Sequence, residues 1–157
     1  MKLTSHEEYG LRCLIRLGQK GPCGKLTIPE ISNAEGISEA YAGKLLRMLR
    51  LGGFVVAARG SGGYSLARPA SQIVIGDVMP LLGGRLFEGN FCEAHPGQLK
   101  ACVRLADCSV RVLWRALQAA VDDVLKRTTL QDLLFTEQQM ITWVKCLGEF
   151  SSQIARQ

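Results

Sequence analysis

Apolar residues recur with a helical period through the first fifty residues of the chain. The pattern predicts a first helix from a cap at Thr4 or Ser5 to about Gln19, where a glycine- and proline-containing stretch begins. A second helix is predicted over residues 27–36, between a threonine cap and a terminating glycine. Ser38 caps a third helix, which ends at a pair of glycines.

A β-hairpin is predicted directly after the third helix. Residues 54–56 (Phe-Val-Val) form the outgoing strand, and residues 64–66 (Tyr-Ser-Leu) form the returning strand. The turn between them, residues 59–63, is Arg-Gly-Ser-Gly-Gly, which is basic and almost free of bulky side chains. Three short helices followed by such a hairpin are typical of a winged helix-turn-helix. The predicted fold is mostly α with a small β-hairpin wing.

The rest of the chain is predicted to be helical around an irregular middle. A short helix is predicted from Ser71 to Leu82, and residues 83–107 are glycine-rich. Ser109 caps a long helix with an apolar seam of Leu113, Leu117, Ala120, Val121, Val124 and Leu125. We favour a homodimer built on this helix, because repressor-type DNA-binding proteins commonly pair to match two-fold DNA sites. The alternative is a helix that only covers the winged domain.

The last segment carries its own helix signal. Thr136 and Gln139 form a capping-box pattern for an amphipathic helix that runs to about Ala155. The predicted organisation therefore has four parts: a winged helix-turn-helix domain (1–70), a connecting helix with a cysteine-bearing loop (71–107), a dimerisation helix (108–135) and a C-terminal amphipathic helix (136–157).

Composition indicates a globular chain without a membrane span. Its 157 residues are 47% hydrophobic, and no apolar run approaches the roughly 20 residues that a membrane helix needs. The N-terminus carries acids and arginines where a signal peptide needs an apolar region, so we expect a cytoplasmic protein. Residues 1–70 contain ten Lys and Arg against five Asp and Glu, whereas residues 71–157 contain nine of each. This bias indicates an anionic partner for the N-terminal part, or an ordinary solvated basic surface.

The third helix and the wing carry side chains suited to double-stranded DNA. Short or polar side chains at the start of the helix are available to base edges: Ser38, Glu39, Ala40 and Ala42. Cations further along are available to phosphates or guanines: Lys44, Arg47 and Arg50. At the wing tip, with Gly60 and Ser61 beside it, Arg59 can enter a narrow A·T-rich minor groove. Simpler roles exist: Glu39 stabilises the helix dipole, and the glycines permit a tight hairpin.

Three cysteines, Cys92, Cys102 and Cys108, lie within the stretch FCEAHPGQLKACVRLADC. In a reducing compartment, clustered cysteines more often bind metal or carry redox chemistry than form disulfides. An iron–sulfur cluster, a zinc site completed by His95, and a metal-free thiol redox switch therefore remain open. Cys13 and Cys146 fit buried apolar positions better.

Two other classes of function are disfavoured. A thiol oxidoreductase is not supported, because no C-x-x-C occurs and no strand–helix alternation surrounds the cysteines; the chain is not expected to be an enzyme. A protein-interaction module that does not bind DNA is disfavoured by the positive charge of residues 1–70.

Several motifs resemble the IscR/NsrR/RirA family of bacterial winged-helix regulators. They are M-K-L-T-S…Y-G-L-R at the start, I-S-N-A-E-G-I-S-E-A-Y with K-L-L-R-M-L-R, R-G-S-G-G-Y-S-L-A at the wing, S-V-R-V-L-W-R-A-L after the cysteines, and T-T-L-Q-D-L. The resemblance covers roughly residues 1–134. Three departures are visible: the wing is one residue shorter, the interval from Cys92 to Cys102 is longer than in IscR, and Arg111 stands where IscR has its histidine ligand.

The resemblance implies a dimeric transcription factor, commonly a repressor, that binds palindromic A·T-rich promoter sites. It also implies that Cys92, Cys102 and Cys108 ligate an iron–sulfur cluster, 2Fe–2S or 4Fe–4S, which senses nitric oxide, iron or redox state. In NsrR-like members an acid of the first helix of the other protomer supplies the fourth ligand, and that position here is Glu8. Arg12, one turn later, matches a residue that supports this ligand.

Overall fold

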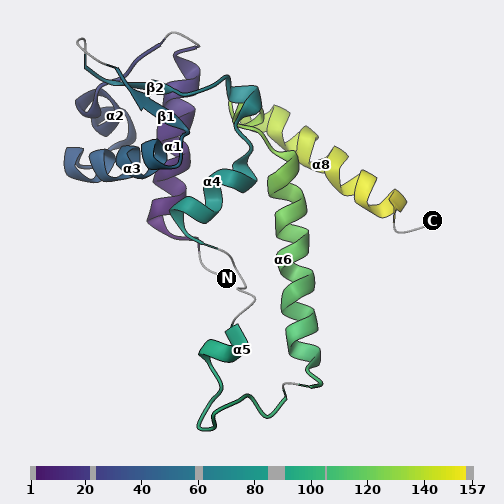
Figure 1. The fold of residues 1–157 in the computed structure, drawn as a ribbon. Coiled ribbons are helices and arrows are strands. Elements are labelled where there is room, and N and C mark those ends of the chain that lie inside the picture. Colours follow the sequence, from purple (N-terminus) through teal and green to yellow (C-terminus); the bar gives the residue numbers. More distant parts are fainter. Residues whose placement is uncertain (1–2, 22–23, 59–61, 85–90, 105, 155–157) are drawn as a thin grey trace.

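The computed structural model describes residues 3–21, 24–58, 62–84, 91–104 and 106–154 of the 157-residue chain (Figure 1). The N-terminal body contains α1 (Ser5–Gln19), α2 (Ile28–Glu35), α3 (Glu39–Leu51), β1 (Val55–Ala57) and β2 (Tyr64–Leu66). The remainder contains the 3₁₀ turn η1 (Ala70–Gln72), α4 (Ile75–Leu82), α5 (Phe91–Ala94), α6 (Ser109–Arg127), α7 (Leu130–Leu133) and α8 (Glu137–Ile154). The fold is mostly helical with a two-stranded antiparallel sheet, as the sequence predicts.

Local capping chemistry fixes where the first helices begin. The Thr4 N–H donates to the Glu7 carboxylate at 2.7 Å, and the Thr27 N–H donates to Glu30 at the same distance, so each helix starts with a capping box. The Ser38 hydroxyl accepts a hydrogen bond from the backbone N–H three residues later, at 3.2 Å, and so caps α3. Gly36 ends α2 in the left-handed region with φ 65°, which a residue with a side chain rarely adopts.

The wing is held to the helical body on both sides. Within the sheet, Val55 pairs with Leu66 in the antiparallel register. Tyr64 also exchanges two backbone hydrogen bonds with Leu26, in the segment before α2, at 2.7 and 3.0 Å. The outgoing strand begins one residue later than predicted, because the Phe54 N–H donates to the Leu49 carbonyl of α3 at 3.0 Å. The predicted wing-tip residues 59–61 lie outside the described residues.

One continuous apolar core joins the N-terminal helices to the segment after α6. Its fully buried side chains include Leu14, Leu17, Ile31, Leu45, Leu46, Leu49, Ile73, Val78 and Leu130. Leu130 reaches this core because its N–H donates to the Ile73 carbonyl at 2.8 Å, and the Ile75 N–H donates to the Thr128 carbonyl at 2.9 Å. The C-terminal end of α6 is thereby anchored beside α4.

The prediction of one helix from Ser71 to Leu82 is wrong for its first residues. The structure has η1 and then α4, separated by Ile73 and Val74 in extended conformation. Val74 forms a bridge with Thr129, so these residues satisfy their backbone groups against a segment more than fifty positions away. The N-cap of α6 also differs from the prediction, because it is Cys108 and not Ser109. The Cys108 sulfur accepts a hydrogen bond from the Arg111 N–H at 3.4 Å.

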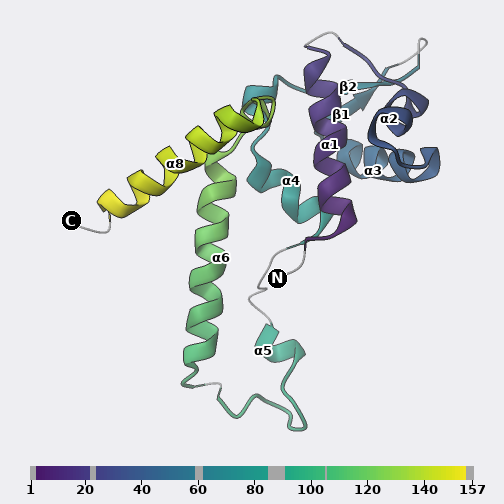
Figure 2. The same cartoon turned by 180° about the vertical axis from the view of Figure 1, so that it is seen from behind.

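The two longest helices leave the body in different directions (Figures 1 and 2). From its anchored C-terminal end, α6 runs away from the wing, and α5 lies toward the remote end of α6. The helix α8 projects outward from the corner where α6 meets the body. Among the described residues, no helix is long and apolar enough to span a membrane.

Candidate DNA-binding surface and cysteine segment

The helix α3 separates a buried apolar face from an exposed polar one. Leu45, Leu46 and Leu49 are fully buried, which fixes the helix on the body. The exposed positions include the predicted DNA-contacting residues Ser38, Glu39, Ala40, Lys44, Arg47 and Arg50. The surface of α3 therefore carries three exposed cations and a polar N-terminal turn, which are the side-chain types that groove-binding helices use.

Ala42 is a correction to the predicted base-contacting set. Its side chain is completely buried in the core cluster, because it lies one turn before Leu45 and Leu46 on the same face of α3. It is therefore a packing residue, whereas Ala40 is exposed.

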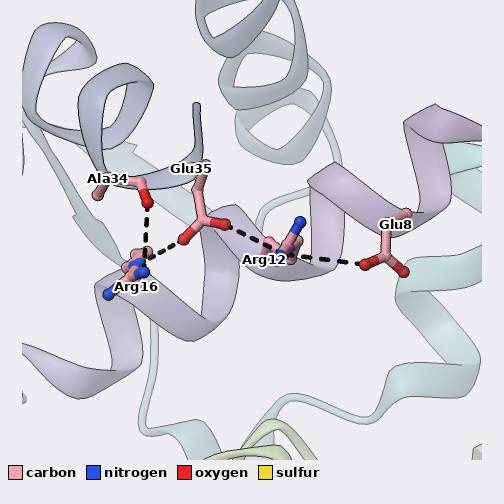
Figure 3. Close-up of polar contacts among 5 residues, drawn as sticks. All are labelled: Glu8, Arg12, Arg16, Ala34 and Glu35. Carbon is pink, nitrogen blue, oxygen red and sulfur yellow. Dashed lines mark hydrogen bonds and ion pairs between the residues drawn. The ribbon is translucent and has the colours of Figure 1, made fainter. Parts of the chain in front are cut away.

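The predicted ligand Glu8 lies exposed on α1 beside Arg12. The side chain of Glu8 is 61% exposed, and its carboxylate lies 3.8 Å from Arg12 Nε (Figure 3). Arg12 also lies over the Tyr9 ring, with its guanidinium carbon 5.5 Å from the ring centroid. The structure thus brings together the two predicted residues of α1, with Glu8 open to a further partner.

Glu35 is a buried charged residue whose role was not predicted from the sequence. Its side chain is only 5% exposed, and it forms ion pairs with Arg12 at 3.1 Å and with Arg16 (Figure 3). A buried carboxylate requires such cations, because an unpaired buried charge is costly. The available signal was the pair of arginines one helical turn apart on α1, a spacing that lets both cations pair with one carboxylate.

The three predicted cluster cysteines are free thiols on the segment that leads into α6. Cys92 lies in α5, Cys102 in the following loop, and Cys108 at the cap of α6; all three are partly exposed. Across the described ranges, no three His, Cys, Asp or Glu side chains form a group that could hold a metal ion. One chain alone therefore assembles neither the set with Glu8 nor the zinc set with His95.

Residues 3–136 match the Rrf2 family model, which is described as an iron-dependent transcriptional regulator. This chain belongs to the Rrf2 family. It is 35% identical over 135 residues to the protein rrf2 of Nitratidesulfovibrio vulgaris. The aligned region covers 85% of this chain and 87% of that protein.

Solved structures of Rrf2-type winged-helix regulators share the fold. T. potens IscR has a TM-score of 0.67 and 30% identity, over 85% of this chain and 86% of that one. The oxidized form of Staphylococcus aureus CymR has a TM-score of 0.67 and 31% identity, over 87% and 98%. This chain is therefore a transcriptional regulator similar to IscR and CymR. Its relatives in the Rrf2 family are regulators, not enzymes. The helix α8 begins after the matched region.

The side chains of this segment are of the types that bind an iron–sulfur cluster, but within a single protomer they do not form a complete site. Thiolates are the usual cluster ligands, and one harder ligand is tolerated. The partly exposed thiols of Cys92, Cys102 and Cys108 meet that chemical requirement. Cys13 does not, because burial and the nearby charge of Glu35 raise the pKa of its thiol to about 12. As predicted, Cys13 is a buried apolar filler; the side chain of Cys146 lies outside the described residues.

Proposed function

We propose that this Rrf2-family regulator is a homodimeric repressor whose affinity for promoter DNA is controlled by an iron–sulfur cluster. Cys92, Cys102 and Cys108 of one protomer would hold the cluster, with Glu8 of a second copy as the fourth ligand. The observation that carries the proposal is the arrangement of donors: three free, partly exposed thiols lie on one segment, and an exposed carboxylate lies on α1. In one chain the described donors form no metal-holding group, the three thiols included, so the proposal requires the cysteine segment to close around the cluster and a second copy to supply Glu8.

The apolar face of α6 supports the homodimer. The exposed apolar side chains of this face are Val110, Leu113, Trp114, Leu117 and Val124. A helix that exposes this much apolar surface buries it against a partner. Since the described part of the chain anchors α6 beside α4 at its C-terminal end, the N-terminal part is available to a second copy.

Leu117→Glu is expected to convert the dimer into a monomer, because burying a carboxylate in an apolar interface without a partner is costly. The Leu117 side chain is 42% exposed in the single chain, so the substitution leaves the protomer core intact. Molar mass from light scattering after size-exclusion chromatography measures the result at micromolar protein. Leu51→Glu, at a 72% exposed leucine of α3, is the control and should keep the dimer mass. A Leu117→Glu variant with dimer mass would contradict the interface.

Anaerobic purification tests the cluster directly. The wild type should be coloured, contain iron and sulfide, and show a Mössbauer spectrum that assigns 2Fe–2S or 4Fe–4S. Cys102→Ser should abolish the colour, whereas Cys23→Ser, which removes a thiol outside the proposed set, should keep it. Glu8→Gln should retain colour but lose iron faster to a chelator, because a weaker ligand replaces the carboxylate. Colourless, iron-free anaerobic protein would exclude the cluster.

Titration of the coloured protein with nitric oxide, with a chelator and with oxidant identifies the signal. The effective signal is the one that changes both the spectrum and the DNA affinity at near-stoichiometric amounts. An exposed carboxylate ligand would give the cluster a labile position suited to such a sensor.

A metal-free thiol switch is the second candidate function. The free thiols are partly exposed, and one similar structure is named as the oxidized form of CymR. In this case the anaerobic protein carries no iron, and mild oxidation alone changes DNA affinity in the wild type but not in Cys102→Ser. A zinc site with His95 would instead give a colourless protein with one zinc per chain.

A further inference from the structure

A cavity, which we call the α1–α7 cavity, lies where the end of α1, the segment from β2 to η1, and α7 meet. Its volume is about 490 Å³, which lies in the range of natural small-molecule sites. Gly18 lines it from α1, Leu66 from β2, and Leu134 from the C-cap of α7. Its described lining includes no residue of α3 or of the cysteine segment, so neither DNA contact nor a cluster explains the cavity.

The walls of the α1–α7 cavity are held in place by the core of the protein. The Leu130 N–H donates to the Ile73 carbonyl at 2.8 Å, and both side chains are fully buried, which fixes α7 against the segment that contains η1. Leu134 packs closely on α1, because a Cβ at Gly18 would lie only 3.1 Å from a Leu134 methyl. The cavity therefore forms without an occupant, and a ligand would pay little to order its walls.

Arg68 brings a positive charge to the lining of the α1–α7 cavity. In the described part of the chain Arg68 forms no ion pair, and its guanidinium carbon lies 5.2 Å from the centroid of the Phe54 ring. An exposed contact with a ring contributes little, whereas a guanidinium binds a carboxylate through two parallel charged hydrogen bonds. Arg68 can therefore exchange the ring for an anion in the cavity. No Asp or Glu occurs among the described lining residues to repel that anion.

The remaining lining side chains set the kind of anion. Leu66, Pro69 and Leu134 are apolar, whereas the Ser71 hydroxyl and the Gln131 amide are hydrogen-bonding groups that no other described side chain engages. One cation with two neutral polar groups suits a single carboxylate, because phosphate esters and nucleotides are held by several cations or backbone N–H groups. We propose that the α1–α7 cavity binds a small organic monocarboxylate with an apolar body.

Titration of the full-length protein with sodium hexanoate tests the site. In nitrogen–proton correlation NMR spectra, the amide signals of Gly18, Ser71 and Gln131 should move and then saturate at millimolar hexanoate. Hexanamide has the same shape without the charge, and acetate has the charge without the apolar body, so each should bind about tenfold or more weakly. No saturable movement of these signals, or equal affinity for hexanoate and hexanamide, would overturn the proposal.

Two variants change the cavity in different ways. Arg68→Gln removes the cation and should weaken hexanoate binding about tenfold or more, whereas Arg115→Gln, at an exposed arginine of α6, should leave it unchanged. Ala67→Leu keeps the charge but adds bulk to an exposed lining residue, so it should also weaken binding. If circular dichroism shows that Arg68→Gln does not fold, Ala67→Leu decides alone. Wild-type affinity in a folded Arg68→Gln or Ala67→Leu variant would place the ligand elsewhere and overturn the proposal.

The α1–α7 cavity and the proposed cluster can be tested independently. Hexanoate that binds only the folded protein should raise the melting temperature of the wild type, and it should do so equally in Cys102→Ser, which lacks a proposed cluster ligand. The rise should be lost in Arg68→Gln. Colourless anaerobic protein that binds hexanoate would reject the cluster and keep the carboxylate site. Coloured protein whose melting temperature hexanoate does not change would keep the cluster and reject the carboxylate site.

Discussion

Replacing Lys44, Arg47 and Arg50 together with alanine is expected to lower the affinity for duplex DNA by on the order of a hundredfold or more. All three side chains are exposed on the face of α3 opposite its buried leucines. A base-contacting arginine contributes about 1–3 kcal/mol, and each phosphate that a cation neutralises contributes a counterion-release term. Titrations at several salt concentrations should give a log–log slope that is shallower by about one for every phosphate that the variant no longer neutralises.

A charge-matched variant separates direct binding by α3 from general attraction. Arg115, Lys126 and Lys145 are exposed cations of α6 and α8, and their replacement with alanine also takes the net charge from +5 to +2. This control should bind DNA within about a few-fold of the wild type, because long-range attraction beyond roughly 10 Å is screened at physiological salt. Equal losses of affinity in the two triple variants would show that α3 is not the DNA-binding surface. Circular dichroism should show unchanged folding, since every substituted residue is exposed.

Local sequence chemistry was sufficient to predict most of the N-terminal body. The caps at Thr27 and Ser38 and the left-handed Gly36 act over three or four residues, so their effects are visible without tertiary structure. The hairpin and the long helix were likewise predictable from short-range periodicity. The prediction nevertheless placed Ala42 among the base-contacting residues, whereas it lies on the buried face of α3 with Leu45, Leu46 and Leu49.

The features that were not predictable depend on interactions between distant segments. The helix predicted from Ser71 is interrupted because Val74 pairs with Thr129, and no pattern among the neighbouring residues predicts that pairing. The burial of Glu35 likewise depends on arginines 19 and 23 positions away, which only the packing of α1 against α2 brings near. For the cysteines, sequence supplied the donor types, and the ligand set remains a prediction because a single chain does not bring them together.

Leu46→Ala is expected to destabilise the protein by about 2–5 kcal/mol and to lower its melting temperature by roughly 4–20 °C. Leu46 is fully buried where α3 packs on the core, so the smaller alanine side chain leaves a cavity that the surrounding helices fill only partly. Leu51→Ala, on the same helix but 72% exposed, is the matched control and should change stability by less than about 0.5 kcal/mol.

Chemical and thermal denaturation at equal protein concentrations measure the difference between the two leucine variants, since dimerisation makes stability concentration-dependent. Well below its melting temperature, the Leu46→Ala variant should still bind DNA, because its missing side chain faces away from Lys44, Arg47 and Arg50. Loss of stability with retained binding would show that the two faces of α3 have separate roles. Equal stability of the two variants would instead show that Leu46 does not lie in the core.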